Sequence, residues 1–305
     1  GVAQIKINAR ADGEGAHAIK CLDGGSVTVG GNAGATGELA CGIYVDESND
    51  MDTTVTVNGN ITVSGDSSQG VSVNGEKTFL EVGGNVTVDG NGASGISASG
   101  GNYDDTYMVW IAGDVTAPDV AVNATAGAGV RVSGNTMSTD EGATAIFAVG
   151  GSVTVDGNVT ATGINGTAIS ASKWDLIEPV AGAFVMVDGK ITAFTPLRIQ
   201  SLPVGENEHT GETAVFGHYI YTDGTNTVWA KEDSFVFTNP NAQAPGIISH
   251  PQDVTVEPGE AVTLTVQAFV IDGGVLSYQW YSNTTSDFSS GPPIDGATNT
   301  SYTPP

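Results

Sequence analysis

The chain has 305 residues, enough for two domains or for one elongated repeat domain with a smaller second one. Its 9 Lys and Arg are outnumbered by 34 Asp and Glu, for a formal net charge of −25. Nucleic acids and anionic membrane surfaces bind clustered basic side chains, so this charge argues against both as partners. Hydrophobic residues at 39% are too many for a disordered chain, and no run of them is long enough to span a membrane.

The first two-thirds of the sequence repeats the motif Gly-x-h-Thr-h, in which h is Val, Ile or Ala. The copies begin at irregular intervals, so the pattern predicts short strands joined by loops of variable length. An extra copy begins at Gly157. The six main copies are residues 25–29, 59–63, 84–88, 113–117, 151–155 and 189–193.

Two further segments accompany most copies, and in each of them apolar residues occupy every second position. Residues 55–57 and residues 42–45 are examples. Three short strands per unit cannot bury their apolar faces within that unit, but stacked units can. We therefore expect an all-β fold in which residues 1–200 form a right-handed parallel β-helix, a solenoid of six or seven coils. A β-propeller is the alternative, but its blades need longer antiparallel strands.

Residues 201–240 break this pattern with longer alternating segments that predict antiparallel strands. We expect them to form a β-rich cap over the open end of the solenoid, because a bare strand edge promotes aggregation. Pro and Gly then mark residues 241–246 as a linker.

Residues 247–305 contain alternating segments at 251–256 and 261–268, then Tyr-Gln-Trp-Tyr at 278–281 and Ser-Tyr-Thr-Pro-Pro at 301–305. In combination they resemble the Ig-like modules of surface proteins of Gram-positive bacteria. The resemblance implies a disulfide-free β-sandwich with Trp280 in its core. A complete sandwich has about seven strands, so we expect the module to be incomplete at residue 305.

The Thr of each main copy should point outward, because its apolar neighbours point inward. One stacked ladder is expected, and stacking of β-branched residues across strands accounts for it. Ice-binding solenoids are the functional alternative, but they usually show two such ranks of Thr. The Asn-x-Thr sequons at Asn60, Asn85 and Asn158 are by-products of the same motif. The ladder comprises Thr28, Thr62, Thr87, Thr116, Thr154 and Thr192.

Residues 46–52 carry oxygen ligands at alternating positions, as a Ca²⁺-binding loop does. Asp46, Asp50 and Asp52 are the candidate ligands. The segment lacks the Gly and the distal Glu of an EF-hand, so a solvated acidic loop is the competing interpretation.

Cys21 and Cys41 both fall at positions that should face the core. Buried free thiols and one structural disulfide across the first coil are equally compatible with this placement. Neither alternative makes these cysteines reactive.

The sequence assigns no catalytic residue. Enzymes with this fold use clustered carboxylates and a basic residue on one outer face, and the outward Arg131 is the base candidate. The histidines are scattered without metal-ligand spacing, and a Gly-x-Ser-x-Gly elbow and a P-loop are missing. Exposed aromatic residues on inserted loops are the candidates for stacking on sugars: Tyr103, Tyr107, Trp110 and Trp174. Trp174 could equally cover a small core within its own loop.

The resemblance to surface proteins implies an extracellular protein of the bacterial cell surface. We expect a monomeric adhesin or ligand-binding protein that uses the rigid β-helix to bind a glycan or a host or other extracellular protein. No cofactor is required, unless the acidic loop binds Ca²⁺. A polysaccharide lyase or hydrolase of the β-helix type and a structural spacer are the alternatives.

Overall fold

The structure is a computed structural model that divides into two units, Gly1–Asn239 and Pro240–Pro305. Every regular element in the described part of the chain is a β-strand. In the segment 210–215 the description covers the backbone alone. The described residues are 1–22, 24–46, 52–100, 108–173, 182–200, 202–204, 210–215, 217–231, 233–238, 245–252, 254–256, 260–269, 276–283 and 291–304.

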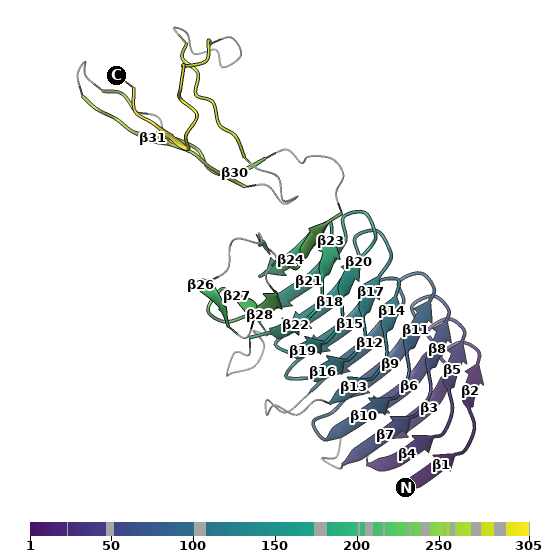
Figure 1. Cartoon of the computed structure of the whole chain (residues 1–305). Helices are drawn as coiled ribbons and strands as arrows, with labels where there is room; N and C mark the ends of the chain where they lie inside the picture. Colours follow the sequence, from purple (N-terminus) through teal and green to yellow (C-terminus); the bar gives the residue numbers. More distant parts are fainter. Residues whose placement is uncertain are drawn as a thin grey trace. The chain divides into compact units, whose positions relative to one another are not determined.

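Unit 1 is a parallel β-solenoid of about seven turns, as the repeat predicts (Figure 1). Each turn adds one strand to each of three long sheets, which we name A, B and C in chain order. Within each sheet, strands of successive turns pair in parallel.

Sheet A has eleven strands. In spatial order they are β1 (Val2–Ile5), β4 (Gly25–Val29), β7 (Thr53–Val57), β10 (Thr78–Val82), β13 (Val109–Ile111), β16 (Gly129–Val132), β19 (Ser152–Val155), β22 (Phe184–Val187), β28 (Thr227–Lys231), β27 (His218–Thr222) and β26 (Thr210–Val215).

Sheet B has nine strands. They are β2 (Ala9–Asp12), β5 (Ala33–Thr36), β8 (Ile61–Ser64), β11 (Val86–Asp89), β14 (Val115–Ala117), β17 (Thr136–Ser138), β20 (Val159–Ala161), β23 (Ile191–Ala193) and β29 (Phe235–Phe237).

Sheet C also has nine strands. They are β3 (His17–Leu22), β6 (Cys41–Asp46), β9 (Gln69–Asn74), β12 (Ser94–Ser99), β15 (Val120–Thr125), β18 (Thr144–Val149), β21 (Thr167–Ser172), β24 (Thr195–Ile199) and β25 (Leu202–Pro203).

The core is a stack of apolar rows that run along the solenoid axis. Successive side chains of a strand point to opposite sides, so every second residue faces the interior. In sheet C, one inward row is aligned by the strand register, and each of its members from the second turn onward is fully buried. That row consists of Ile43, Val71, Ile96, Val122, Ile146, Ile169 and Leu197.

Sheets A and B are joined in every turn by three residues, and most of these connections end in Asn. The backbone N–H of Asn60 donates to Asn32 Oδ1, and the N–H of Asn85 donates to Asn60 Oδ1, both at 2.8 Å. The ladder continues through Asp114, whose Oδ1 accepts the N–H of Asn135 at 2.7 Å. These bonds pair backbone groups that lie between strands and would otherwise lose a partner.

The middle residue of this connection is Gly in most turns, because neighbouring turns approach too closely for a side chain. A Cβ on Gly84 would lie 2.2 Å from Asn60 Oδ1 and 2.8 Å from the backbone of Gly59. The Gly-Asn pair in the repeated motif is therefore a requirement of the corner, and the sequons at Asn60, Asn85 and Asn158 result from it.

The connections from sheet B to sheet C vary between one and five residues, whereas those from sheet C to sheet A vary most. The C–A connections range from two residues between β18 and β19 to the long connections at residues 47–52, 100–108 and 173–183. The long loop insertions that the sequence predicts thus lie at the corner between sheets C and A, and the A–B corner alone keeps a constant length.

The repeated motif does not lie in a single column, so the prediction of one Thr ladder is wrong. Thr28 and Thr154 belong to sheet A, whereas Thr62 pairs with Thr87 and Thr87 with Thr116 in sheet B. Strands of sheet A and of sheet B can both carry the motif: it lies on β4 and β19 in sheet A, and on β8, β11 and β14 in sheet B.

The expected cap, residues 201–240, belongs to the same unit as the solenoid up to Asn239. Strands β26, β27 and β28 pair antiparallel, but β28 also pairs in parallel with β22, and β29 pairs in parallel with β23. The segment therefore adds a further rung to sheets A and B.

Unit 2 contains two small antiparallel sheets, and an Ig-like sandwich is not confirmed. Strand β30 (Gly246–Ser249) pairs with β32 (Gln267–Phe269), and β31 (Leu264–Thr265) pairs with β33 (Ser301–Tyr302). Trp280 is half-buried; its Nε1–H donates to Asn299 O at 2.8 Å, and its ring stacks on Tyr302.

Replacing Asn60 by Ala removes the acceptor for the N–H of Asn85. We expect the free energy of unfolding to fall by about 1 kcal/mol, the net contribution of one such hydrogen bond. Urea unfolding followed by circular dichroism measures the change. Asn60→Asp is the control, because Asp114 serves as an acceptor at the equivalent corner. Equal losses in the two variants would contradict a role for the ladder.

Candidate functional site

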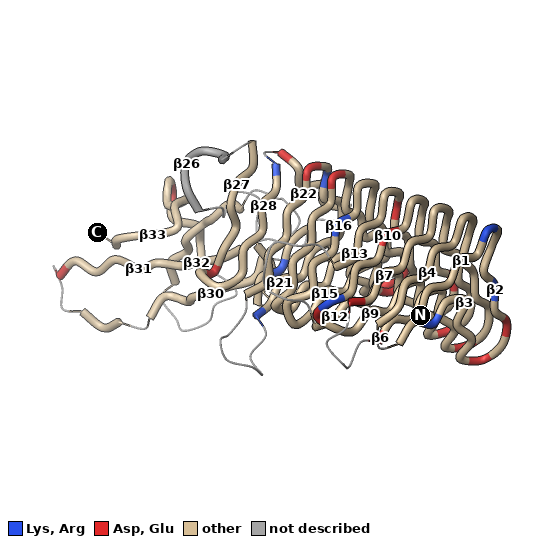
Figure 2. Tube along the Cα trace, turned by 90° about the horizontal axis from the view of Figure 1, so that it is seen from below, with Lys and Arg blue, Asp and Glu red and all other residues tan. Residues whose placement is uncertain are grey.

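The outer face of sheet A combines aromatic rings with polar partners on successive strands. Its inward residues, such as Leu80, Val109 and Val185, are fully buried, so the residues between them point outward. In Figure 2 the strands of this sheet are mostly tan, and charged residues lie mainly at turns. This face is the candidate ligand-binding site.

The first aromatic group, which we name the β10–β13 cluster, consists of Phe79 and Trp110, beside the buried Met108. Phe79 and Trp110 are 40% and 38% exposed, although each lies between residues that face the core. The Nε1–H of Trp110 donates to Ser133 Oγ at 3.1 Å. This bond holds one edge of the indole and leaves the ring partly open to solvent.

The second group, the β22–β28 cluster, consists of Phe184, Met186 and Trp229. Phe184 is 37% exposed, and its ring centroid lies 6.4 Å from that of Trp229 at an interplanar angle of 53°. Met186 pairs with Trp229 across the two strands. In both clusters the Phe lies on one strand and the Trp on the next, two positions further along.

Between the clusters, β16 and β19 present a polar strip of two partly exposed residues, Arg131 and Ser152, whereas Gly129 and Thr154 of the same strands are buried. Arg131 Nη2 lies 3.0 Å from Asp156 Oδ2 and 3.2 Å from Oδ1. The pair is partly buried and neutralises the charge of the guanidinium locally. Arg131 faces outward as predicted, but it is engaged with a carboxylate that the sequence did not suggest.

The strand register fixes the separation of the clusters. Trp110 pairs with Arg131, Arg131 with Thr154, Thr154 with Met186, and Met186 with Trp229. Four strand steps therefore separate the two indoles, a distance of about 19 Å at the usual spacing of paired strands. Phe79 and Phe184 are separated by the same number of steps.

Of the four predicted sugar-stacking residues, Trp110 is described and lies on this face, in the middle of β13 and not on an inserted loop as expected. Tyr103, Tyr107 and Trp174 lie outside the described residues. In the sequence, their segments lead into β13 and β22, the strands that carry Trp110 and Phe184. Sequence reasoning missed Phe79, Phe184 and Trp229, although each is an aromatic residue at a strand position where alternation predicts a polar one.

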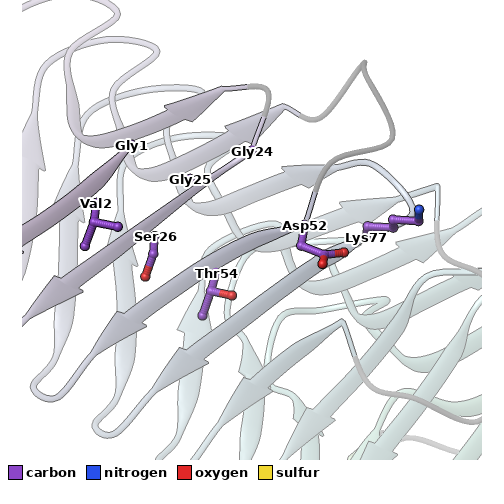
Figure 3. A pocket seen from close by; sticks show the side chains of 8 residues that line it. All are labelled: Gly1, Val2, Gly24, Gly25, Ser26, Asp52, Thr54 and Lys77. Carbon is purple, nitrogen blue, oxygen red and sulfur yellow. The ribbon is translucent and has the colours of Figure 1, made fainter.

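The predicted Ca²⁺ ligands are only partly described. Asp46 Oδ1 accepts a hydrogen bond from Asn74 Nδ2 at 3.1 Å, and Asp50 lies outside the described residues. Asp52 and Lys77 line an open pocket of about 630 Å³ beside the start of sheet A, shown in Figure 3. Ca²⁺ binding stays a prediction.

His218 is a polar residue inside the last turns of sheet A. It is 3% exposed, and its Nε2 lies 2.9 Å from Asp188 Oδ1, which is also 3.6 Å from Lys231 Nζ. Asp188 follows β22 directly and Lys231 ends β28. The group links adjacent turns at the edge of the face.

Cys21 and Cys41 are buried and free. The register pairs Cys41 with His17 and Cys21 with Val45, so the two cysteines are offset by four residues along neighbouring strands. This offset corresponds to about 13 Å, beyond the reach of a disulfide. The structure therefore favours the thiol alternative.

Comparisons with known proteins leave the family open: the sequence matches no protein-family model, no curated protein and no solved structure. Among the described residues, no three His, Cys, Asp or Glu side chains gather as a metal site would require. The same residues include no helix that is long and apolar enough to cross a membrane.

Both thiols should resist modification in the folded protein. Burial raises the pKa of Cys41 to about 12 and also raises the pKa of Cys21, so neither is a thiolate near pH 8. We expect Ellman's reagent to react slowly at pH 7 and at pH 9, and to titrate two thiols after unfolding without reductant. An intact mass two hydrogens lower would reveal a disulfide and contradict this assignment.

Proposed function

We propose that this chain is part of an extracellular adhesin of the bacterial cell surface and that it binds a glycan on the outer face of sheet A. The observation that carries the proposal is Trp110, an exposed indole whose N–H is held by Ser133 on a rigid sheet. Sugar rings have apolar C–H faces that pack on aromatic rings, while their hydroxyl groups bond to polar neighbours.

The polar strip supplies those neighbours. The guanidinium and carboxylate of Arg131 and Asp156, with the hydroxyl of Ser152, offer donors and acceptors of the kind that sugar hydroxyls use. All of them lie within a few strand steps of Trp110. A protein partner would more often be bound through a larger apolar patch with a polar rim.

The parallel solenoid supports the adhesin class. Strands of consecutive turns pair in parallel, so the outer face of sheet A lies on a stiff support. We expect this support to keep its conformation when the ligand binds. We further propose that residues 247–305 belong to an Ig-like module, on the strength of the resemblance and of the contacts of Trp280 with Asn299 and Tyr302. Such modules typically space binding domains away from a cell surface.

Trp110→Ala should weaken binding to a responsive glycan about tenfold, since one aromatic stacking contact contributes roughly 1 kcal/mol or more. A glycan array probed with the full chain identifies the ligand, and calorimetry measures the dissociation constant. Phe147→Ala is the matched control, because Phe147 is 37% exposed on sheet C, away from this face.

Two results would count against the proposal. An unchanged dissociation constant for Trp110→Ala would remove sheet A as the site. Release of shorter products from a bound polysaccharide would favour the lyase or hydrolase alternative instead.

A further inference from the structure

We propose that the ligand is a neutral, linear glycan that lies along the solenoid axis and contacts the β10–β13 and β22–β28 clusters at the same time. The inference rests on the proposed function and specifies the chemistry and the direction of its ligand. It is carried by the repetition of one aromatic arrangement, four strand steps apart, on a single sheet.

The direction follows from the register. Trp110 and Trp229 occupy the same position in the row that also contains Arg131, Thr154 and Met186. That row runs perpendicular to the strands, along the axis. A chain in this direction meets aromatic rings at both ends and the partly exposed Arg131 between them, whereas a chain along one strand meets only one cluster.

The length follows from the spacing. The clusters are about 19 Å apart at four strand steps. A disaccharide is too short to touch both, and a hexasaccharide is long enough. The inward residues of the intervening strands, Val130, Val153 and Val185, are fully buried, so the separation of the clusters is held by the core.

Contact with both clusters strengthens binding without any new kind of interaction. Once one end of the glycan is bound, the other end is held near the second cluster at a high effective concentration. The clusters do not have to move toward each other, because the sheet already fixes their distance, and this lowers the entropy lost on binding.

The neutral charge of the ligand follows from the groups on the face. Arg131 is the cation of the polar strip, and Asp156 compensates it at 3.0 Å. Glu81 pairs with Trp110 in the register and adds a negative charge to the first cluster. Together with the net charge of −25, these groups disfavour a polymer of uronic acids.

The test measures binding of neutral oligosaccharides of increasing length by calorimetry, using β-1,4-linked glucose, mannose and xylose from disaccharide to hexasaccharide. Hexagalacturonate is the acidic comparison. We expect at least one neutral hexasaccharide to bind with a stoichiometry of one and at least tenfold more tightly than its disaccharide. Hexagalacturonate should bind more weakly than that hexasaccharide.

Substitutions measure the contribution of each cluster to binding separately. Trp110→Ala and Trp229→Ala should each weaken hexasaccharide binding about tenfold, and each should reduce the gain of hexasaccharide over disaccharide. Because Trp229 is half-buried, Phe184→Ser provides a second, more exposed change in the same cluster. Phe147→Ala on sheet C should leave both affinities unchanged.

The outcomes distinguish this inference from the function on which it rests. Binding that depends on Trp110 but not on Trp229 or Phe184, or that gains nothing with length, overturns the bridging glycan and keeps glycan binding. Tighter binding of hexagalacturonate overturns the neutral ligand. If no oligosaccharide binds, both proposals fail, and concentration-dependent self-association would identify a second copy as the occupant of the face.

Discussion

The three-residue connection between sheets A and B holds the whole solenoid in register. Its Asn side chains accept backbone N–H groups of the following turn, and its Gly residues let neighbouring turns approach closely. Because this connection never changes length, each strand of sheet B begins at the same point relative to its partner in sheet A. The rows of the core and of the outer faces are consequences of that constancy.

The solenoid could be predicted because its signal is repeated. A short strand by itself is ambiguous, but the combination of Gly, an alternating apolar pair and an outward Thr recurs too often to be accidental. What the pattern could not show is which sheet each copy belongs to. The copies at residues 25–29 and 151–155 look like the others, yet pairing with Thr56 and Arg131 places Thr28 and Thr154 in sheet A.

The candidate site was only partly accessible to sequence reasoning, because its members are distant in the chain. Trp110 was recognised as an exposed aromatic, but its relation to Trp229 depends on the register of three intervening strands and on a strand that follows the last regular turn. The ion pair of Arg131 with Asp156 likewise joins residues of different turns. In unit 2 the strand pairs are short and not repeated, so no second copy of the pattern reinforces the first.

The corner between sheets C and A has a consequence for how such a protein can change. Insertions or deletions there alter only the connection between a strand of sheet C and the next strand of sheet A. The register between sheets A and B is set independently by the three-residue A–B corner. Loop length can therefore drift or be redesigned without shifting the spacing of the aromatic rows. Different loops between sheets C and A could therefore border an unchanged outer face of sheet A. Hypervariable loops vary on a conserved framework in the same way.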